Sequence, residues 1–103
     1  MGKGKIAAQV GHASVQAFLN AGVTHPSEVE AWLASGQKKI CVKVQDETVF
    51  NELMVLASKR GVAHHLVRDA GHTQIPSGSP TVLSLGPAEE STLDELTGHL
   101  KLL

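Results

Sequence analysis

Residues 62–85 read VAHHLVRDAGHTQIPSGSPTVLSL and contain two short apolar segments separated by a long polar one. Val62–Arg68 and Thr81–Leu85 have the length and aliphatic composition of β-strands. Between them, the twelve residues Asp69–Pro80 include two glycines, two prolines and several hydroxyl side chains, which is the composition of a loop. A loop of this length in a small domain often has a function, such as binding a ligand. The sequence therefore predicts two strands joined by a functional loop.

Helices are predicted before this pair of strands. Residues 4–21 repeat apolar side chains at helical spacing, and Gly22 is the predicted end of that helix. Pro26 followed by Ser27-x-x-Glu30 has the pattern of a capping box, which predicts the start of a second helix.

Two further helices and one further strand complete the predicted order. Asp46 is the predicted N-cap of a third helix that ends at Gly61, and a fourth helix begins at Ser91 and ends at Gly98. Lys38–Val44 alternates apolar and polar side chains, which predicts a strand. The order helix, helix, strand, helix, strand, strand, helix is typical of an α/β fold.

The composition limits the class of protein. The chain has 103 residues, 42% apolar and 18% charged, which suits one folded domain with a core. Its longest purely apolar run, Leu53–Ala57, is far too short to cross a bilayer, and the N-terminus has no secretory signal pattern. We therefore expect a soluble, cytoplasmic protein that does not contact membranes. Cys41 is the only cysteine, so no internal disulfide is expected.

Charge is segregated along the chain, although the net charge is only −1. Residues 1–45 contain five Lys and two Glu, whereas residues 46–103 contain four basic and eight acidic side chains. This distribution permits a local, salt-sensitive contact with phosphates through the first part of the chain. Ordinary variation of surface charge would produce the same distribution.

Two lysines, Lys3 and Lys5, stand at the predicted start of the first helix. Cations are unfavourable there because the helix dipole already places partial positive charge at that end. The two lysines therefore indicate an anionic ligand, which would meet ammonium groups and free backbone N–H groups together. The Walker pattern GxxxxGK[ST] is absent, so a nucleotide-binding P-loop is not predicted.

Polar residues continue along that helix. Lys5, Gln9, His12 and Gln16 recur about one turn apart and form a stripe. A solvated helix face explains the stripe as well as a binding site does, and for Gln16 it is the preferred interpretation. Asp69 is a second candidate because it follows a strand, where α/β sheets usually bind ligands. An Asp so close to a Gly is also common in turns.

Metal-binding and nucleophile sites are not indicated. His64 and His65 point to opposite faces of a predicted strand and cannot chelate one ion, and no HExxH motif occurs. Cys41 lies within a predicted strand, and no GxSxG motif occurs. Aromatic residues make up only 3%, which disfavours base-stacking platforms. We expect neither a metal nor another cofactor.

Several motifs occur in one order along the chain: MGKGKIAAQ with a histidine three residues later, the Lys38–Val44 segment, DAGxTQI, GSxTVL and the C-terminal TGHLKLL. Over essentially the whole chain, this series closely resembles the type-two peptidyl-tRNA hydrolases, the archaeal and eukaryotic class. The resemblance implies an enzyme that hydrolyses the ester joining a peptide to the terminal ribose of tRNA. Such an enzyme recycles tRNA from aborted translation.

The resemblance also implies which residues form the site. The implied catalytic positions are Lys5, Asp69, Thr73 and Thr81, and the implied substrate-binding positions are Lys3, Gln9, His12 and Gln74. The residue types suit ester hydrolysis, because Asp69 could deprotonate water while Lys5 and Thr73 hold the developing oxyanion. The implied partner is peptidyl-tRNA, and pairing with a second copy as a homodimer is left open.

For the fold, the resemblance implies a three-layer α/β/α sandwich around a small mixed sheet, with four strands in the family. Family members carry further residues before MGKGK, including the first strand, whereas this sequence begins at the matching Met. We therefore expect a single domain over residues 1–103 that is N-terminally incomplete: a fragment, an internally started product or an incomplete gene model. Family loops also read Pro-Gly-Ser where this chain has PSGS over residues 76–79, which affects the placement of Thr81.

An active hydrolase is the preferred interpretation of these motifs. A non-catalytic RNA-binding or protein-interaction remnant of the same family would carry the same motifs. An unrelated anion-binding α/β domain would need the whole series to arise by coincidence. Cleavage of an N-blocked aminoacyl-tRNA separates the first two interpretations.

Overall fold

The computed structural model of the protein describes residues 1–69 and 78–103. In chain order its elements are α1 (Lys3–Thr24), α2 (Pro26–Ala34), α3 (Thr48–Lys59), β1 (His64–Arg68), β2 (Pro80–Leu85) and α4 (Glu90–Thr97). The α/β class predicted from the sequence is confirmed. Thr73 and Gln74, two of the predicted site residues, lie outside the described residues.

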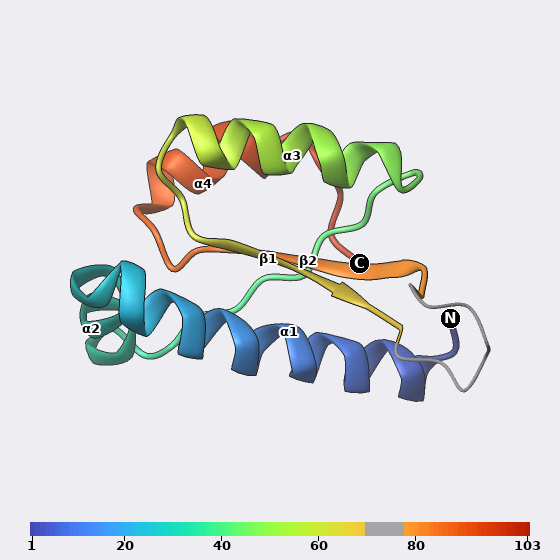
Figure 1. The fold of residues 1–103 in the computed structure, drawn as a ribbon, viewed down its shortest axis with the longest axis horizontal. Helices are drawn as coiled ribbons and strands as arrows, with labels where there is room; N and C mark the ends of the chain where they lie inside the picture. The colour runs from blue at the N-terminus through green and yellow to red at the C-terminus, as the bar shows by residue number, and fades with distance from the viewer. Residues whose placement is uncertain (70–77) are drawn as a thin grey trace.

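The helices lie on both sides of β1 and β2 (Figure 1). α1 and α2 lie on one side of the strands, and α3 and α4 lie on the other. α1 packs against both strands, whereas α3 packs against β1 and α4. One face of the long helix α1 is therefore held alongside the sheet.

β1 and β2 form an antiparallel pair, and no other strand joins their sheet within the described ranges. The pairing runs from His64 opposite Leu85 to Arg68 opposite Pro80. The Gly86 N–H extends the ladder by donating a hydrogen bond to the Ala63 carbonyl (2.7 Å). The expected sheet was mixed and lacked the first of the family's four strands, whereas the sheet observed in the described ranges is antiparallel and two-stranded.

The predicted strand over residues 38–44 is wrong. That segment forms one isolated antiparallel bridge, Val42 opposite Leu102, beside which the Lys43 N–H donates to the Lys101 carbonyl (2.9 Å). Alternation of side chains is not sufficient for a strand, because a strand also needs a ladder of hydrogen bonds along an edge. Only the C-terminal residues supply such a partner in the part of the chain that the structure describes.

A proline, and not a glycine, ends α1. The predicted end at Gly22 is wrong, because the helix continues past it. The residue before a proline disfavours helical geometry, so the helix ends before His25, whose N–H donates to the Ala21 carbonyl (2.6 Å). Pro26 is the first residue of α2, and Ser27 already lies inside it. The predicted capping box is therefore also wrong.

Gly61 follows the end of α3 as predicted, whereas Asp46 lies one residue before the N-cap, which is Glu47, and still accepts hydrogen bonds at the start of the helix. One Asp46 carboxylate oxygen accepts a hydrogen bond from the Thr48 N–H (2.9 Å) and another from the Thr48 hydroxyl. The Thr48 hydroxyl bond, and next the N–H bond, hold the pKa of Asp46 below its ordinary value. At the other end Gly61 has a φ of 68°, and the Val62 N–H donates to the Ala57 carbonyl (2.8 Å). This is a helix end that glycine favours.

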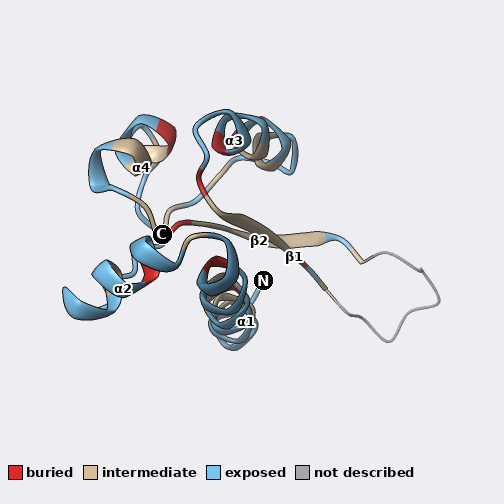
Figure 2. Cartoon of the chain, turned by 60° about the vertical axis from the view of Figure 1, so that its left-hand side comes forward, coloured by how far each residue is buried: buried red, intermediate tan, exposed pale blue. Residues whose placement is uncertain are grey.

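The buried side chains in the described residues are mainly Ala and Val, with two Leu, and they lie on both sides of the strands (Figure 2). Ala57, Val62 and Leu96 form a cluster on the side of α3 and α4. Ala13 and Ala21 are the buried residues of α1. Small side chains on α1 allow its backbone to approach the strands closely, which brings its polar residues next to β1.

Candidate active site

The first turn of α1 contains nothing that offsets its positive end. Gly2 is the N-cap, no side chain caps the helix, and the first turn has no acidic residue. Lys3 and Lys5 both lie in this turn and are exposed. Their charges add to that of the helix dipole, so the turn as a whole favours a bound anion.

Folding joins this turn to the C-terminal end of β1. The Lys5 ammonium nitrogen lies 2.7 Å from Asp69 Oδ2, although 64 positions separate the two residues in the sequence. Asp69 follows β1 directly, and its N–H donates a hydrogen bond to the Ser79 carbonyl (3.0 Å), which fixes its backbone. The two side chains are 49% and 33% exposed. Solvent therefore screens this ion pair, which contributes at most about 1 kcal/mol to stability.

A second contact from α1 fixes a carboxamide beside the ion pair. The Thr81 hydroxyl lies 3.1 Å from Gln9 Oε1 and 3.2 Å from the Val67 carbonyl oxygen, and its one proton is shared between these two acceptors. Thr81 is in β2 and Gln9 is one turn beyond Lys5 in α1. Because the oxygen of the Gln9 amide is engaged, its NH₂ group is left to donate hydrogen bonds.

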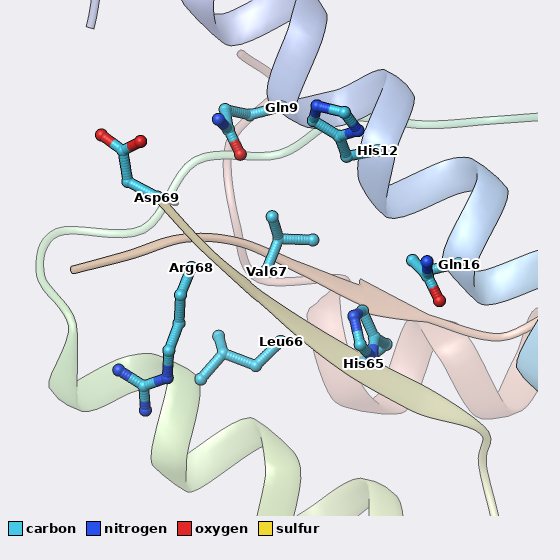
Figure 3. A pocket seen from close by; sticks show the side chains of 8 residues that line it. All are labelled: Gln9, His12, Gln16, His65, Leu66, Val67, Arg68 and Asp69. Carbon is cyan, nitrogen blue, oxygen red and sulfur yellow. The ribbon is translucent and has the colours of Figure 1, made fainter. Parts of the chain in front are cut away.

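An open pocket of about 440 Å³ adjoins these residues. Three residues of α1 line one side of it, Gln9, His12 and Gln16, and residues 65–69 line the other. Asp69 and Gln9 lie at one end of the pocket, whereas His65 and Gln16 lie at the opposite end (Figure 3). The ion pair is therefore at the end of an elongated pocket between α1 and β1.

The structure brings four of the eight predicted site residues together. Lys5, Gln9, Asp69 and Thr81 come together from α1, the end of β1, and β2. His12 lies on the pocket wall. Lys3 is exposed on the same turn as Lys5 and forms no ion pair with another described residue. The remaining two predicted residues, Thr73 and Gln74, lie outside the described ranges.

Sequence reasoning missed the far end of the pocket. Gln16 is exposed, which fits its interpretation as part of a solvated face, but it also lines the pocket. His65 was considered only as a metal ligand, yet it lines the pocket and its Nδ1 lies 3.3 Å from the Asn20 amide nitrogen. Strand alternation was the available signal, because it places His65 on the same side of β1 as Val67 and Asp69.

The site combines a carboxylate, an ammonium group and a carboxamide at one end of an open pocket. A carboxylate can accept a proton from water, and ammonium and N–H donors can stabilise an oxyanion. Within residues 1–69 and 78–103, no cluster of three His, Cys, Asp or Glu side chains is placed to bind a metal ion. No helix in these ranges is both long and apolar enough to span a membrane.

The sequence of the chain as a whole is similar to those of known proteins. The family model described as "Peptidyl-tRNA hydrolase PTH2" matches residues 1–103. The "Peptidyl-tRNA hydrolase" of Methanocaldococcus jannaschii is 46% identical over 103 residues, which is all of this chain and 90% of that protein. The protein of the same name from Thermococcus onnurineus is 46% identical over 100% of this chain and 87% of its own length. The mouse "Peptidyl-tRNA hydrolase 2, mitochondrial" is 45% identical over 99% of this chain and 56% of its own length. The chain belongs to the PTH2 family of peptidyl-tRNA hydrolases.

Proposed function

We propose that this protein is a peptidyl-tRNA hydrolase, which cleaves the ester between a peptide, or an N-blocked amino acid, and tRNA. The observation that carries the proposal is the 2.7 Å contact between Lys5 and Asp69 at the end of an open pocket. Ester hydrolysis needs a proton acceptor for water and a donor for the oxyanion, and these two side chains are of the required types. The names of the relatives support the same reaction.

In the proposed reaction, the Asp69 carboxylate removes a proton from water as the water oxygen attacks the ester carbonyl carbon. The Lys5 ammonium group and the Gln9 NH₂ group donate hydrogen bonds to the carbonyl oxygen as it gains negative charge. The bond from this carbon to the ribose oxygen then breaks, and the proton held by Asp69 passes to the ribose oxygen. The products are a free tRNA end and a peptide acid, which loses its own proton to solvent.

The other predicted residues have supporting roles in this proposal. Thr81 holds the Gln9 carboxamide, so Thr81 is a positioning residue. Thr73 is proposed as a further oxyanion donor, and Gln74, Lys3 and His12 as substrate contacts, on the strength of the family resemblance. Lys3 and Lys5 lie together at the start of α1, where the helix dipole also favours the phosphates of the tRNA end.

The reaction is tested with N-acetyl-aminoacyl-tRNA as substrate. We expect the protein to release tRNA, and we expect Asp69→Asn to lower kcat by about 10²–10⁴-fold, because the variant cannot accept the proton. Asp46→Asn is the matched control, since Asp46 binds Thr48 at the start of α3, outside the pocket, and the variant should leave kcat unchanged. Turnover by Asp69→Asn within a few fold of the unmodified protein would exclude Asp69 as the base. Tight binding of the substrate without cleavage would instead support a non-catalytic RNA-binding role.

A further inference from the structure

The part of the pocket beyond Gln9 takes no part in the chemical step proposed above. It extends between α1 and β1 towards Gln16 and His65 (Figure 3). Lys5 and Asn20 lie fifteen positions apart on the polar face of α1, which is about 22 Å along the helix. A ligand that reaches from the ion pair to His65 must therefore be elongated.

The distribution of charge along α1 indicates which part of the site would bind the RNA of the proposed substrate and which would bind its peptide. α1 has no charged side chain after Lys5, so its only fixed charges are Lys3 and Lys5 in the first turn. Arg68, although it borders the pocket, points away from α1 and donates to the Gly78 carbonyl (3.2 Å). Phosphates of RNA would find cations at the start of α1 and none beyond Gln9. Because the ester joins RNA to peptide, the uncharged part of the pocket is left for the peptide.

His65 presents a hydrogen-bond donor to this part of the pocket. The Asn20 amide nitrogen can only donate, so the His65 Nδ1 at 3.3 Å is the acceptor and the ring proton is on Nε2. No other residue in the described ranges accepts a hydrogen bond from Nε2. Together with the carboxamide of Gln16 and the imidazole of His12, this N–H group can bind peptide carbonyls or amides.

The backbone of β1 offers a second set of hydrogen bonds. The Ala63 carbonyl and the Asp69 N–H both face the β2 side of the ladder, and antiparallel ladders alternate. The N–H and C=O of Leu66 therefore face the outer edge of β1, where no described residue pairs with them. Leu66 borders the pocket although its side chain points away from α1, so its backbone contributes to the lining (Figure 3). An extended peptide can add to such an edge as a strand.

We propose that the peptide of the substrate binds in this pocket as an added strand along the outer edge of β1. Its carboxyl end lies at Lys5 and Asp69, and its upstream residues lie against Gln16 and His65. Residues 65–69 line the pocket along β1, so about five residues of an extended chain lie beside this stretch. This inference rests on the proposed function, because it assigns the peptide end of that substrate.

The inference is tested by binding and not by cleavage. Two ligands are compared, each an RNA hairpin joined to its peptide part by an amide in place of the ester. One carries a single N-acetylated residue and the other carries a six-residue peptide. We expect the six-residue analogue to bind about tenfold more tightly, because it gains several hydrogen bonds. His65→Ala should remove this advantage and His65→Gln, which keeps an N–H donor, should restore part of it. His99→Ala is the matched control, since His99 is exposed and outside the pocket.

A second probe does not depend on any variant. N-methylation of single peptide residues in the six-residue analogue removes one N–H donor at a time, and a strand on β1 predicts loss of affinity at every second position. Equal affinities for the short and long analogues, or an affinity loss that does not alternate, would overturn the inference. Hydrolysis of the matching ester substrates tests the proposed function separately. A length advantage without hydrolysis would refute the function and retain the peptide site.

Discussion

At the scale of single residues, the Lys5–Asp69 ion pair is expected to matter for turnover and not for folding. Both side chains are partly exposed, so the pair stabilises the fold by at most about 1 kcal/mol. Lys5→Met should therefore lower kcat by about 10²–10³-fold, because it removes an oxyanion donor, while the free energy of unfolding changes little. Steady-state kinetics and urea unfolding of one preparation measure both effects. Lys39→Met is the control, because Lys39 lies over the Trp32 ring and not in the pocket.

A loss of stability of several kcal/mol in Lys5→Met, with kcat unchanged, would show that Lys5 is structural. Lys5 and Lys39 differ in their surroundings, because Lys5 forms an ion pair with Asp69 and Lys39 lies over the Trp32 ring. Comparison of their variants therefore separates the loss of a lysine from the loss of this contact.

Thr81 is expected to act through Gln9. Thr81→Val keeps the shape of the side chain but removes the hydroxyl that donates to Gln9 Oε1 (3.1 Å). The Gln9 amide can then rotate, and we expect kcat to fall about tenfold with little change in KM, which corresponds to one weakened hydrogen bond in the transition state. Thr81→Ser should recover most of the lost activity. If Thr81→Ser and Thr81→Val are equally impaired, the hydroxyl is not what matters at this position.

At the scale of elements, the start of α3 is expected to make stability depend on pH. Hydrogen bonds from Thr48 lower the pKa of Asp46 in the folded protein relative to its unfolded value near 3.8. The folded state thus binds this proton less readily, so the stabilisation is present above the unfolded pKa and is lost as pH falls through the folded pKa. Asp46→Ala should have a lower melting temperature than the unmodified protein at neutral pH, and the difference should shrink in acid.

The control for this effect is the neighbouring residue. Glu47 is the N-cap of α3, but its side chain makes no cap hydrogen bond. Circular dichroism melts of Glu47→Ala should show no comparable difference between neutral and acidic pH. A pH-independent difference for Asp46→Ala would mean that the carboxylate charge is not the source of its stabilisation.

The elements also show which structural features a sequence can reveal. Gly61 was predicted correctly because a positive φ at a helix end is a local requirement that glycine meets. The strand expected over residues 38–44 depended on a hydrogen-bonding partner elsewhere in the chain, which side-chain alternation does not reveal. Pro26 ended α1 through its effect on the preceding residue, and this local rule outweighed the weak tendency of Gly22 to end a helix.

The same distinction applies to the candidate site. Lys5 could be identified from the sequence because a lysine at the start of a helix opposes the dipole. Its contact with Asp69 followed from the family resemblance and from no local pattern, since 64 positions separate them. His65 was considered only as a metal ligand, because strand alternation shows which side of β1 it faces but not that Asn20 and the pocket lie there.

At the scale of the whole molecule, the arrangement of helices on both sides of two strands places one long helix along β1 (Figure 1). No large apolar side chain in the described residues is completely buried. The residues that form the core are mainly Ala and Val. The close approach of α1 to the strands is thus achieved with small side chains. The polar face of α1 can then border β1 directly and form the pocket with it.

The restriction of positive charge on α1 to its first turn has a consequence for ionic strength. Each phosphate neutralised by a protein cation releases bound counterions, so the number of such contacts sets how steeply affinity falls with salt. With Lys3 and Lys5 as the two cations, a plot of log affinity against log salt concentration for a single-stranded RNA end should have a slope of about −1.4. Fluorescence anisotropy across a salt series measures it, and Lys3→Gln should halve the slope. The affinity of such a protein for RNA would fall less steeply with salt than that of proteins with broad basic surfaces.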